Sequence, residues 1–147
     1  MSKFTEKIAS FSERHPRLYK SIVLAENVFK KTVFKCQDCG QCALSQNAFT
    51  CCMRCPKQIR NGPCGGTRPN GHCEVYPDRH CIWWLIHKRA NRLKSIGKLK
   101  RFNTPVDRRL HHTSAWMNMF AGRILPIELG KKSKEIKLTK KDPPPVK

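Results

Sequence analysis

The chain has 147 residues, with thirty Lys or Arg against ten Asp or Glu, and a formal net charge of +20. This length allows one compact domain with flanking arms. No apolar run approaches the length that crosses a membrane, and the amino terminus lacks the apolar core of a signal peptide, so we expect a soluble, cytoplasmic protein.

Residues 1–35 are predicted to form an N-terminal helical arm. A first helix is indicated around Ile8, and a second follows Pro16, a residue that suits the first turn of a helix. Apolar residues recur at helical spacing in the second helix, and we expect this stripe to pack on the rest of the chain. The stripe consists of Leu18, Ile22, Ala25 and Phe29.

All nine cysteines lie within residues 36–81, and the first three follow the spacing C-x2-C-x2-C. That spacing lets one loop bring several thiolates to one metal centre. Turn signals such as NGP and PNG, with few large apolar side chains, indicate that the segment is mostly loop. We therefore expect a small, metal-stabilised, loop-rich cysteine domain flanked by α-helices, with little or no sheet. It spans residues 36–101, including the helix that follows the last cysteine.

Three other uses of the thiols are less consistent with the sequence. A disulfide framework conflicts with the odd number of cysteines and with the absence of a signal peptide. Burial of inert thiols in a core conflicts with the scarcity of large apolar residues in the segment. A catalytic thiol with His72 or His80 as its base would leave the remaining cysteines without a role.

Zinc and iron–sulfur clusters both accept all-thiolate ligation. Zinc sites usually use two separated C-x2-C pairs, whereas a C-x2-C-x2-C triplet is the commoner opening of a four-iron cluster. We favour two [4Fe-4S] clusters; the alternatives are one [4Fe-4S] cluster with one zinc, or two zinc ions. The spacing does not say which thiolates form each site.

Glycines in the run NGPCGG are predicted to bind the cofactor through the backbone. They carry no side chain to hold a cofactor away, and their N–H groups can point at sulfur, although a tight ligand loop also needs glycine. The predicted cofactor-binding glycines are Gly62, Gly65 and Gly66.

A third helix is predicted over residues 82–97, ended by Gly97. Its apolar face should include Ile82, Ile86 and residues as late as Leu93 and Ile96. Trp83 and Trp84 cannot both point the same way, so we expect one of them to cover a metal site.

Residues 102–130 are predicted to be a partner-docking arm, because the apolar side chains around Trp116 and Met117 have no evident core of their own. Residues 131–147 are lysine-rich, poor in apolar residues and end in prolines. This composition predicts a disordered basic tail.

Several short motifs together carry a family resemblance. The chain resembles the cysteine-rich domain found with methylenetetrahydrofolate reductases, which occurs at the end of a reductase chain or as a small iron–sulfur subunit. The motifs are CxxCGxC (36–42), CPK (55–57), NGPCGG (61–66), GxCEV (71–75), CxW (81–83) and TSAW (113–116). The combination is specific, although each motif alone is weak.

The resemblance implies a non-catalytic electron-transfer subunit. It would pass electrons between a donor, such as a ferredoxin-like protein, and the FMN or FAD of a separate methylenetetrahydrofolate reductase subunit, because the chain lacks room for a folate-binding barrel of about 250 residues. Cys52 departs from the family, which more often has proline there, so we predict that Cys52 is not a ligand. The predicted metal ligands are Cys36, Cys39, Cys42, Cys51, Cys55, Cys64, Cys73 and Cys81.

A function from another class remains as the alternative: a structural zinc protein whose basic arms bind nucleic acid or an acidic protein. The charge alone favours it. The basic residues are not interleaved with a set of aromatics and no recognition helix is evident, so we expect no nucleic-acid partner.

Overall fold

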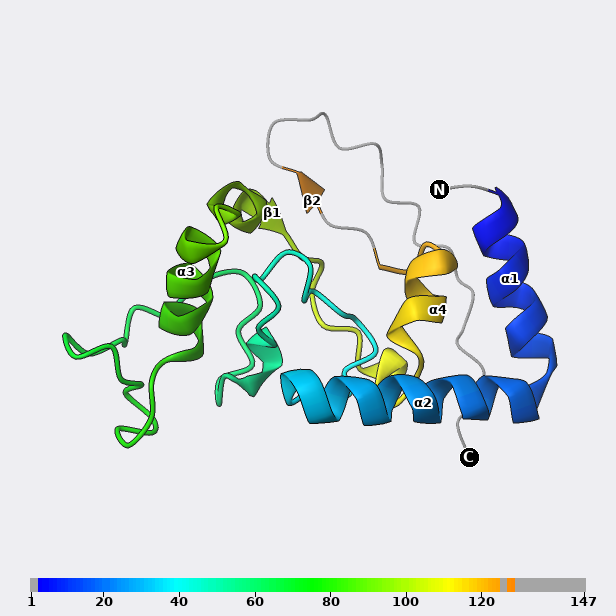
Figure 1. Cartoon of the computed structure of the whole chain (residues 1–147), viewed down its shortest axis with the longest axis horizontal. Coiled ribbons are helices and arrows are strands. Elements are labelled where there is room, and N and C mark those ends of the chain that lie inside the picture. Colours follow the sequence, from blue (N-terminus) through cyan, green and yellow to red (C-terminus); the bar gives the residue numbers. More distant parts are fainter. Residues whose placement is uncertain (1–2, 125–126, 129–147) are drawn as a thin grey trace.

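The computed structural model describes residues 3–124 and 127–128, and helices dominate it (Figure 1). The α-helices are α1 (Lys3–Arg14), α2 (Pro16–Phe34), α3 (Ile82–Arg92) and α4 (Ala115–Phe120). Short 3-10 helices are η1 (Cys52–Arg54), η2 (Ile96–Lys100) and η3 (Arg108–Leu110). Strands β1 (Arg101–Phe102) and β2 (Ile127–Glu128) form one antiparallel pair. The expected helices with little sheet are confirmed; stabilisation by metal stays a prediction.

Helices α1, α2 and α4 form one half of the molecule, with α1 and α4 on the same side of α2 (Figure 1). Pro16 begins α2, as predicted, and Lys35 ends it in the left-handed conformation at φ 50°. The Cys36 N–H then donates to Lys30 O at 3.3 Å, a backbone arrangement common at helix ends. The first cysteine, Cys36, therefore follows directly after the end of the helix.

The buried face of α2 is not the predicted apolar stripe. Leu18, Ala25 and Phe29 are exposed, and only Ile22 of the stripe packs against other helices. The buried positions of α2 are Tyr19, Glu26 and Lys30. A charged pair, rather than an aliphatic stripe, therefore faces the interior.

The segment around α4 packs into a core with α1 and α2. The expectation that its apolar side chains have no core was therefore wrong. Met117 is buried against Ala9 and Tyr19, and Phe120 packs at the edge of this cluster. Trp116 and Met119 remain exposed. Docking by residues 102–130 stays a prediction, and the predicted tail at 131–147 lies outside the described residues.

Helix α3 organises the other half of the molecule. Its buried residues Ile82, Trp83 and Ile86 form a core with Met53 and several cysteines. The helix ends at Arg92, earlier than predicted, because Lys94 turns into the left-handed conformation at φ 50°. Leu93 and Ile96 are consequently exposed rather than part of the buried face.

The cysteine segment, which connects α2 to α3 along the chain, is mostly loop, as predicted. Within residues 36–81 the structure has the single turn of η1 and two isolated bridges, Thr67↔Cys73 and His72↔His80. Asn61 exchanges side-chain hydrogen bonds with the backbone of Asn103, both at 2.8 Å, which fastens the loop to the chain after α3. Within 3–124 and 127–128, every helix is too short or too polar to cross a bilayer.

Met117→Ala is expected to lower the free energy of unfolding by about 2–5 kcal/mol, since it opens a cavity in the core of α1, α2 and α4. Met119→Ala is the matched control, because Met119 lies two residues away on the same helix and is 47% exposed. Urea unfolding followed by circular dichroism measures both. Equal effects of the two substitutions would contradict the packing described for α4.

Candidate metal centres

The nine cysteines line two separate hollows. Site one is lined by the thiols of Cys36, Cys39, Cys42, Cys51 and Cys52, among other residues. Site two is lined by those of Cys55, Cys64, Cys73 and Cys81. All eight predicted ligands thus fall into two groups of four, with Cys52 as a fifth thiol at site one.

Site one is built from the loop that follows α2 and is closed by residues from later in the chain. Gly40 adopts φ +66° and approaches Leu110 so closely that a Cβ would overlap the Leu110 carbonyl oxygen. The Asn118 side chain of α4 donates to Gly40 O at 2.9 Å. The CxxCGxC loop therefore requires glycine at this position and is clamped by η3 and α4.

The thiols of site one differ in acidity. A hydrogen bond with the Cys51 thiol lowers the pKa of Cys36 to about 6 despite partial burial, and the Asp38 N–H, 3.4 Å from its sulfur, acts in the same direction. Burial raises the pKa of Cys39 and of Cys52. Cys36 is therefore more readily ionised for ligation than Cys39 and Cys52.

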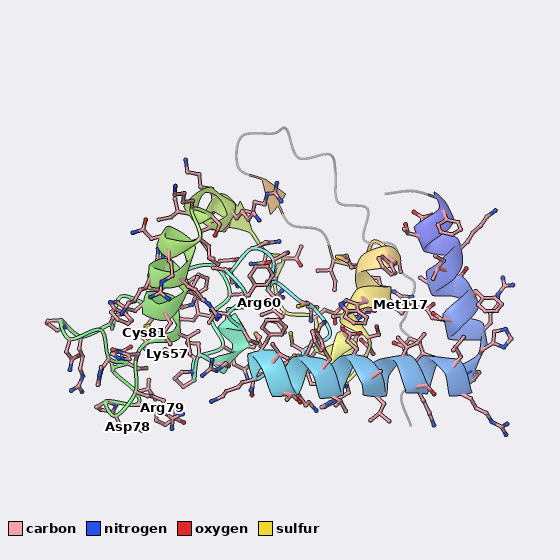
Figure 2. All side chains as sticks on the ribbon, in the orientation of Figure 1. Lys57, Arg60, Asp78, Arg79, Cys81 and Met117 are labelled. Carbon is pink, nitrogen blue, oxygen red and sulfur yellow. The ribbon has the colours of Figure 1, made fainter. Side chains whose placement is uncertain are left out.

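Two buried cations stand beside site one. Lys30 lines the hollow and is 4% exposed. Arg60 is 6% exposed and donates to Gln41 O at 2.9 Å and to Thr104 O at 3.3 Å. Figure 2 places Arg60 in the loops between α3 and α4. Their positive charge favours the thiolate forms that metal binding needs.

Site two lies at the start of α3, where Figure 2 labels Cys81 and Lys57. Cys55 and Cys81 are buried, whereas Cys64 is exposed. The Cys81 N–H donates to Gly71 O at 2.9 Å, which joins the two ends of the loop that carries Cys73. Trp83 lines the hollow and donates from its indole N–H to Ile59 O at 3.1 Å. One tryptophan of the pair thus stands at a thiol site, and its covering of a metal stays a prediction.

A carboxylate stands next to the exposed thiol of site two. Glu74 forms an ion pair with Lys57 and accepts from the Cys64 thiol at 3.4 Å. The hydrogen bond from Lys57, and then that from Cys64, hold the pKa of Glu74 below its usual value. Glu74 thus orients Cys64, the only one of the four site-two thiols that is exposed.

The three predicted cofactor-binding glycines are not equivalent. Gly66 lines site two, where a Cβ would overlap the Glu74 carboxylate. Gly62 and Gly65 adopt φ +129° and +83° and have open space where a Cβ would stand. The turn itself accounts for glycine at these two positions, and their role toward a cofactor stays a prediction.

The donor set of each hollow suits a thiolate-bound metal centre. Within the described ranges, no three His, Cys, Asp or Glu side chains come together closely enough to hold one metal ion. Five cysteines line site one and four line site two. Four thiolates are the ligand set of a [4Fe-4S] cluster and also of structural zinc. The number and kind of donors therefore suit either group, and their convergence on one centre stays a prediction.

Sequence reasoning missed Glu26 and Lys30 at site one, because they stood outside the apolar stripe assigned to α2. One signal was available: the two residues form a Glu-to-Lys pair at i, i+4, and Glu26 is the one acidic residue of that helix. Arg60 and Glu74 carried no comparable signal.

A comparison with known families identifies the chain. The family model described as "Methylene-tetrahydrofolate reductase C terminal" matches residues 15–109. The chain belongs to this family. No curated protein and no solved structure matches the chain.

The match to the methylenetetrahydrofolate reductase C-terminal family confirms the resemblance drawn from the motifs. It extends from the start of α2 to η3, and so includes every cysteine and the whole lining of site two. Thr113 and Ala115, which also line site one, lie beyond it. Helix α4, which closes site one through Asn118, lies beyond the matched residues.

Cys52→Ser is expected to retain the full metal content, because site one has four other thiols. Cys51→Ser, the matched control at the neighbouring position, is expected to lose the metal of site one only. Metal analysis of each purified variant measures this. Loss of metal from the Cys52 variant would overturn the assignment.

Proposed function

We propose that this member of the family is an accessory subunit or domain that binds two [4Fe-4S] clusters and carries electrons to or from the flavin of a methylenetetrahydrofolate reductase. The observation that carries the proposal is the division of the thiols into two hollows lined by four or more each, in a chain of this family. When bound, each cluster would supply one-electron transfer.

The chain's own residues would ligate, orient and shield the clusters. Cys36, Cys39, Cys42 and Cys51 would ligate at site one, and Cys55, Cys64, Cys73 and Cys81 at site two. The Asp38 N–H already donates to a ligand sulfur, the kind of contact that tunes a cluster's potential. Trp83 would limit the access of water to site two.

The two sites differ in exposure, which suggests where electrons enter or leave the chain. At site two Cys64 is exposed, whereas at site one the thiols are buried or half-buried beneath residues of η3 and α4. Electron transfer between proteins needs a short path from cofactor to surface. We therefore propose that electrons pass between this chain and its donor through the surface at Cys64.

A docking surface for the reductase is proposed on the outer face of α2. Leu24 and Val28, one helical turn apart, are more than half exposed there. Every exposed charge of α2 is positive, since Glu26 is its one acid and is buried. An apolar groove edged by carboxylates on the catalytic subunit would match this face.

Electron transfer is tested in the anaerobically purified complex of the full chain with its flavin-bearing reductase subunit. A reduced ferredoxin-like protein is the donor, and bleaching of the flavin is followed. We expect Cys81→Ser to abolish reduction of the flavin by this donor, whereas dithionite still reduces the flavin directly. Unchanged reduction by the donor in a variant that has lost its site-two cluster would contradict an electron path through that site.

Docking is tested with Val28→Glu, which places a charge in the apolar face of α2. We expect at least a tenfold weaker Kd for the reductase subunit in a titration, with the metal content unchanged. Ile96→Glu is the control, because Ile96 is similarly exposed but lies beyond α3. Equal affinities of the two variants would place the docking surface elsewhere.

A further inference from the structure

The buried pair of Glu26 and Lys30 has a position that helix stability does not explain. Both side chains line site one together with its thiols. Glu26 is 2% exposed and Lys30 is 4% exposed, so water screens neither charge effectively. A buried ion pair is a weak source of stability, because desolvation offsets most of the attraction between the partners. Its location beside thiolate ligands suggests an electrostatic role.

The carboxylate and the ammonium of the pair have different neighbours. The Glu26 carboxylate accepts from Lys30, from the Ser114 hydroxyl at 2.5 Å and from the Ala115 N–H at 3.1 Å. The Ser114 and Ala115 donors, at the start of α4, stabilise the negative charge of the carboxylate. The Lys30 ammonium is bonded to Glu26 and lies 5.3 Å from the centre of the Trp116 ring.

The Lys30 ammonium also lies near thiols of site one. Burial by itself would lower the pKa of Lys30, but attraction to the thiolates of Cys42 and Cys36 and the bond to Glu26 outweigh it, so the pKa is raised. Lys30 is thus a buried cation in the lining of site one, which also includes Cys36 and Cys42.

Other charges around site one are already engaged elsewhere. Asp38 is paired with Lys31 at 3.3 Å and with His112 at 3.1 Å. Arg60 faces Cys39 and Cys52 and is held by Gln41 and the Thr104 carbonyl. Asp38 also acts on Cys36, but Lys30 is the buried cation of this group that acts on both Cys36 and Cys42.

We propose that Lys30, positioned by Glu26, is the counter-ion of site one and raises the reduction potential of the cluster bound there. Reduction adds one electron and no proton to the centre, so the thiolate-bound group becomes more negative by one charge. A fixed ammonium stabilises that reduced form more than the oxidised form. The inference rests on the proposed function, because it needs a redox-active group at site one.

The two members of the pair should move the potential in opposite directions. Lys30→Met removes the cation and leaves the carboxylate, so the potential of one cluster should fall. Glu26→Gln removes the anion and keeps a side chain that can still accept from Ser114, so the potential of the same cluster should rise. A purely structural pair gives no reason for opposite signs, since losing either partner would loosen the same site.

The test is a dithionite titration with redox mediators on the anaerobically purified full chain, followed by electron paramagnetic resonance. For Lys30→Met we expect at least a tenfold lower ratio of reduced to oxidised cluster at the wild-type midpoint potential, or about 59 mV for one electron. The second cluster should not move. Lys20→Met is the matched control on the exposed face of α2 and should move neither cluster.

Should Lys30→Met fail to fold, the double variant Glu26→Gln with Lys30→Met keeps an uncharged pair of similar size. Its potential should fall between those of Lys30→Met and Glu26→Gln, and Glu26→Gln alone still reports the sign. Shifts of the same sign, or no shift in either single variant, would overturn the role of Lys30.

Metal content separates this inference from the proposed function. If the purified chain carries zinc and no sulfide, the proposed electron transfer fails. The counter-ion role is then tested by measuring zinc affinity in competition with a chelator. Lys30→Met should bind one of its zinc ions at least tenfold more weakly, whereas Glu26→Gln should not. Equal zinc affinities in wild type and Lys30→Met would overturn it.

Discussion

The buried carboxylate of Glu26 connects parts of the chain that are far apart in sequence. It is bonded to Lys30 in its own helix and to Ser114 and Ala115 at the start of α4. Removing one partner of such a buried pair typically costs about 3–5 kcal/mol, because the remaining charge is left without compensation. Helix α4 is therefore fixed on α2 in one register, and Asn118 is brought to the loop that carries the first cysteines.

The two thiol sites depend on different parts of this framework. Site one lies between the end of α2 and the segment from η3 to α4. This covering segment is far from the first cysteines in sequence. Site two lies under the first turn of α3, and its loops come from the neighbouring sequence. One site is thus assembled by long-range packing and the other mainly by local turns. This difference matches the buried or half-buried thiols of site one and the exposed Cys64 of site two.

Sequence reasoning was most successful where the signal is local. Pro16 marked the start of α2, and the turn-rich composition of residues 36–81 indicated loop. The buried face of α2 was predicted wrongly, because aliphatic spacing was followed and Leu18 and Phe29 lie in solvent. Burial of Glu26 depends on donors from α4, about ninety residues away, which no pattern within α2 reveals.

The division of the thiols could not be predicted from spacing. Cys51 and Cys55 are four residues apart, yet they line different hollows, because the turn of η1 lies between them. The pattern C-x2-C-x2-C did predict a shared site for the first three cysteines, which line one hollow. The assignment of the later cysteines depends on how the loops fold back on α3. That path is set by contacts such as Cys81 N–H to Gly71 O.

The central claim is that each hollow holds an iron–sulfur cluster. It is tested most directly by counting iron, acid-labile sulfide and zinc in the full chain purified without oxygen. Two four-iron clusters predict about eight iron and about eight sulfide ions per chain, with no zinc. About two zinc ions per chain, with neither iron nor sulfide, would contradict the claim.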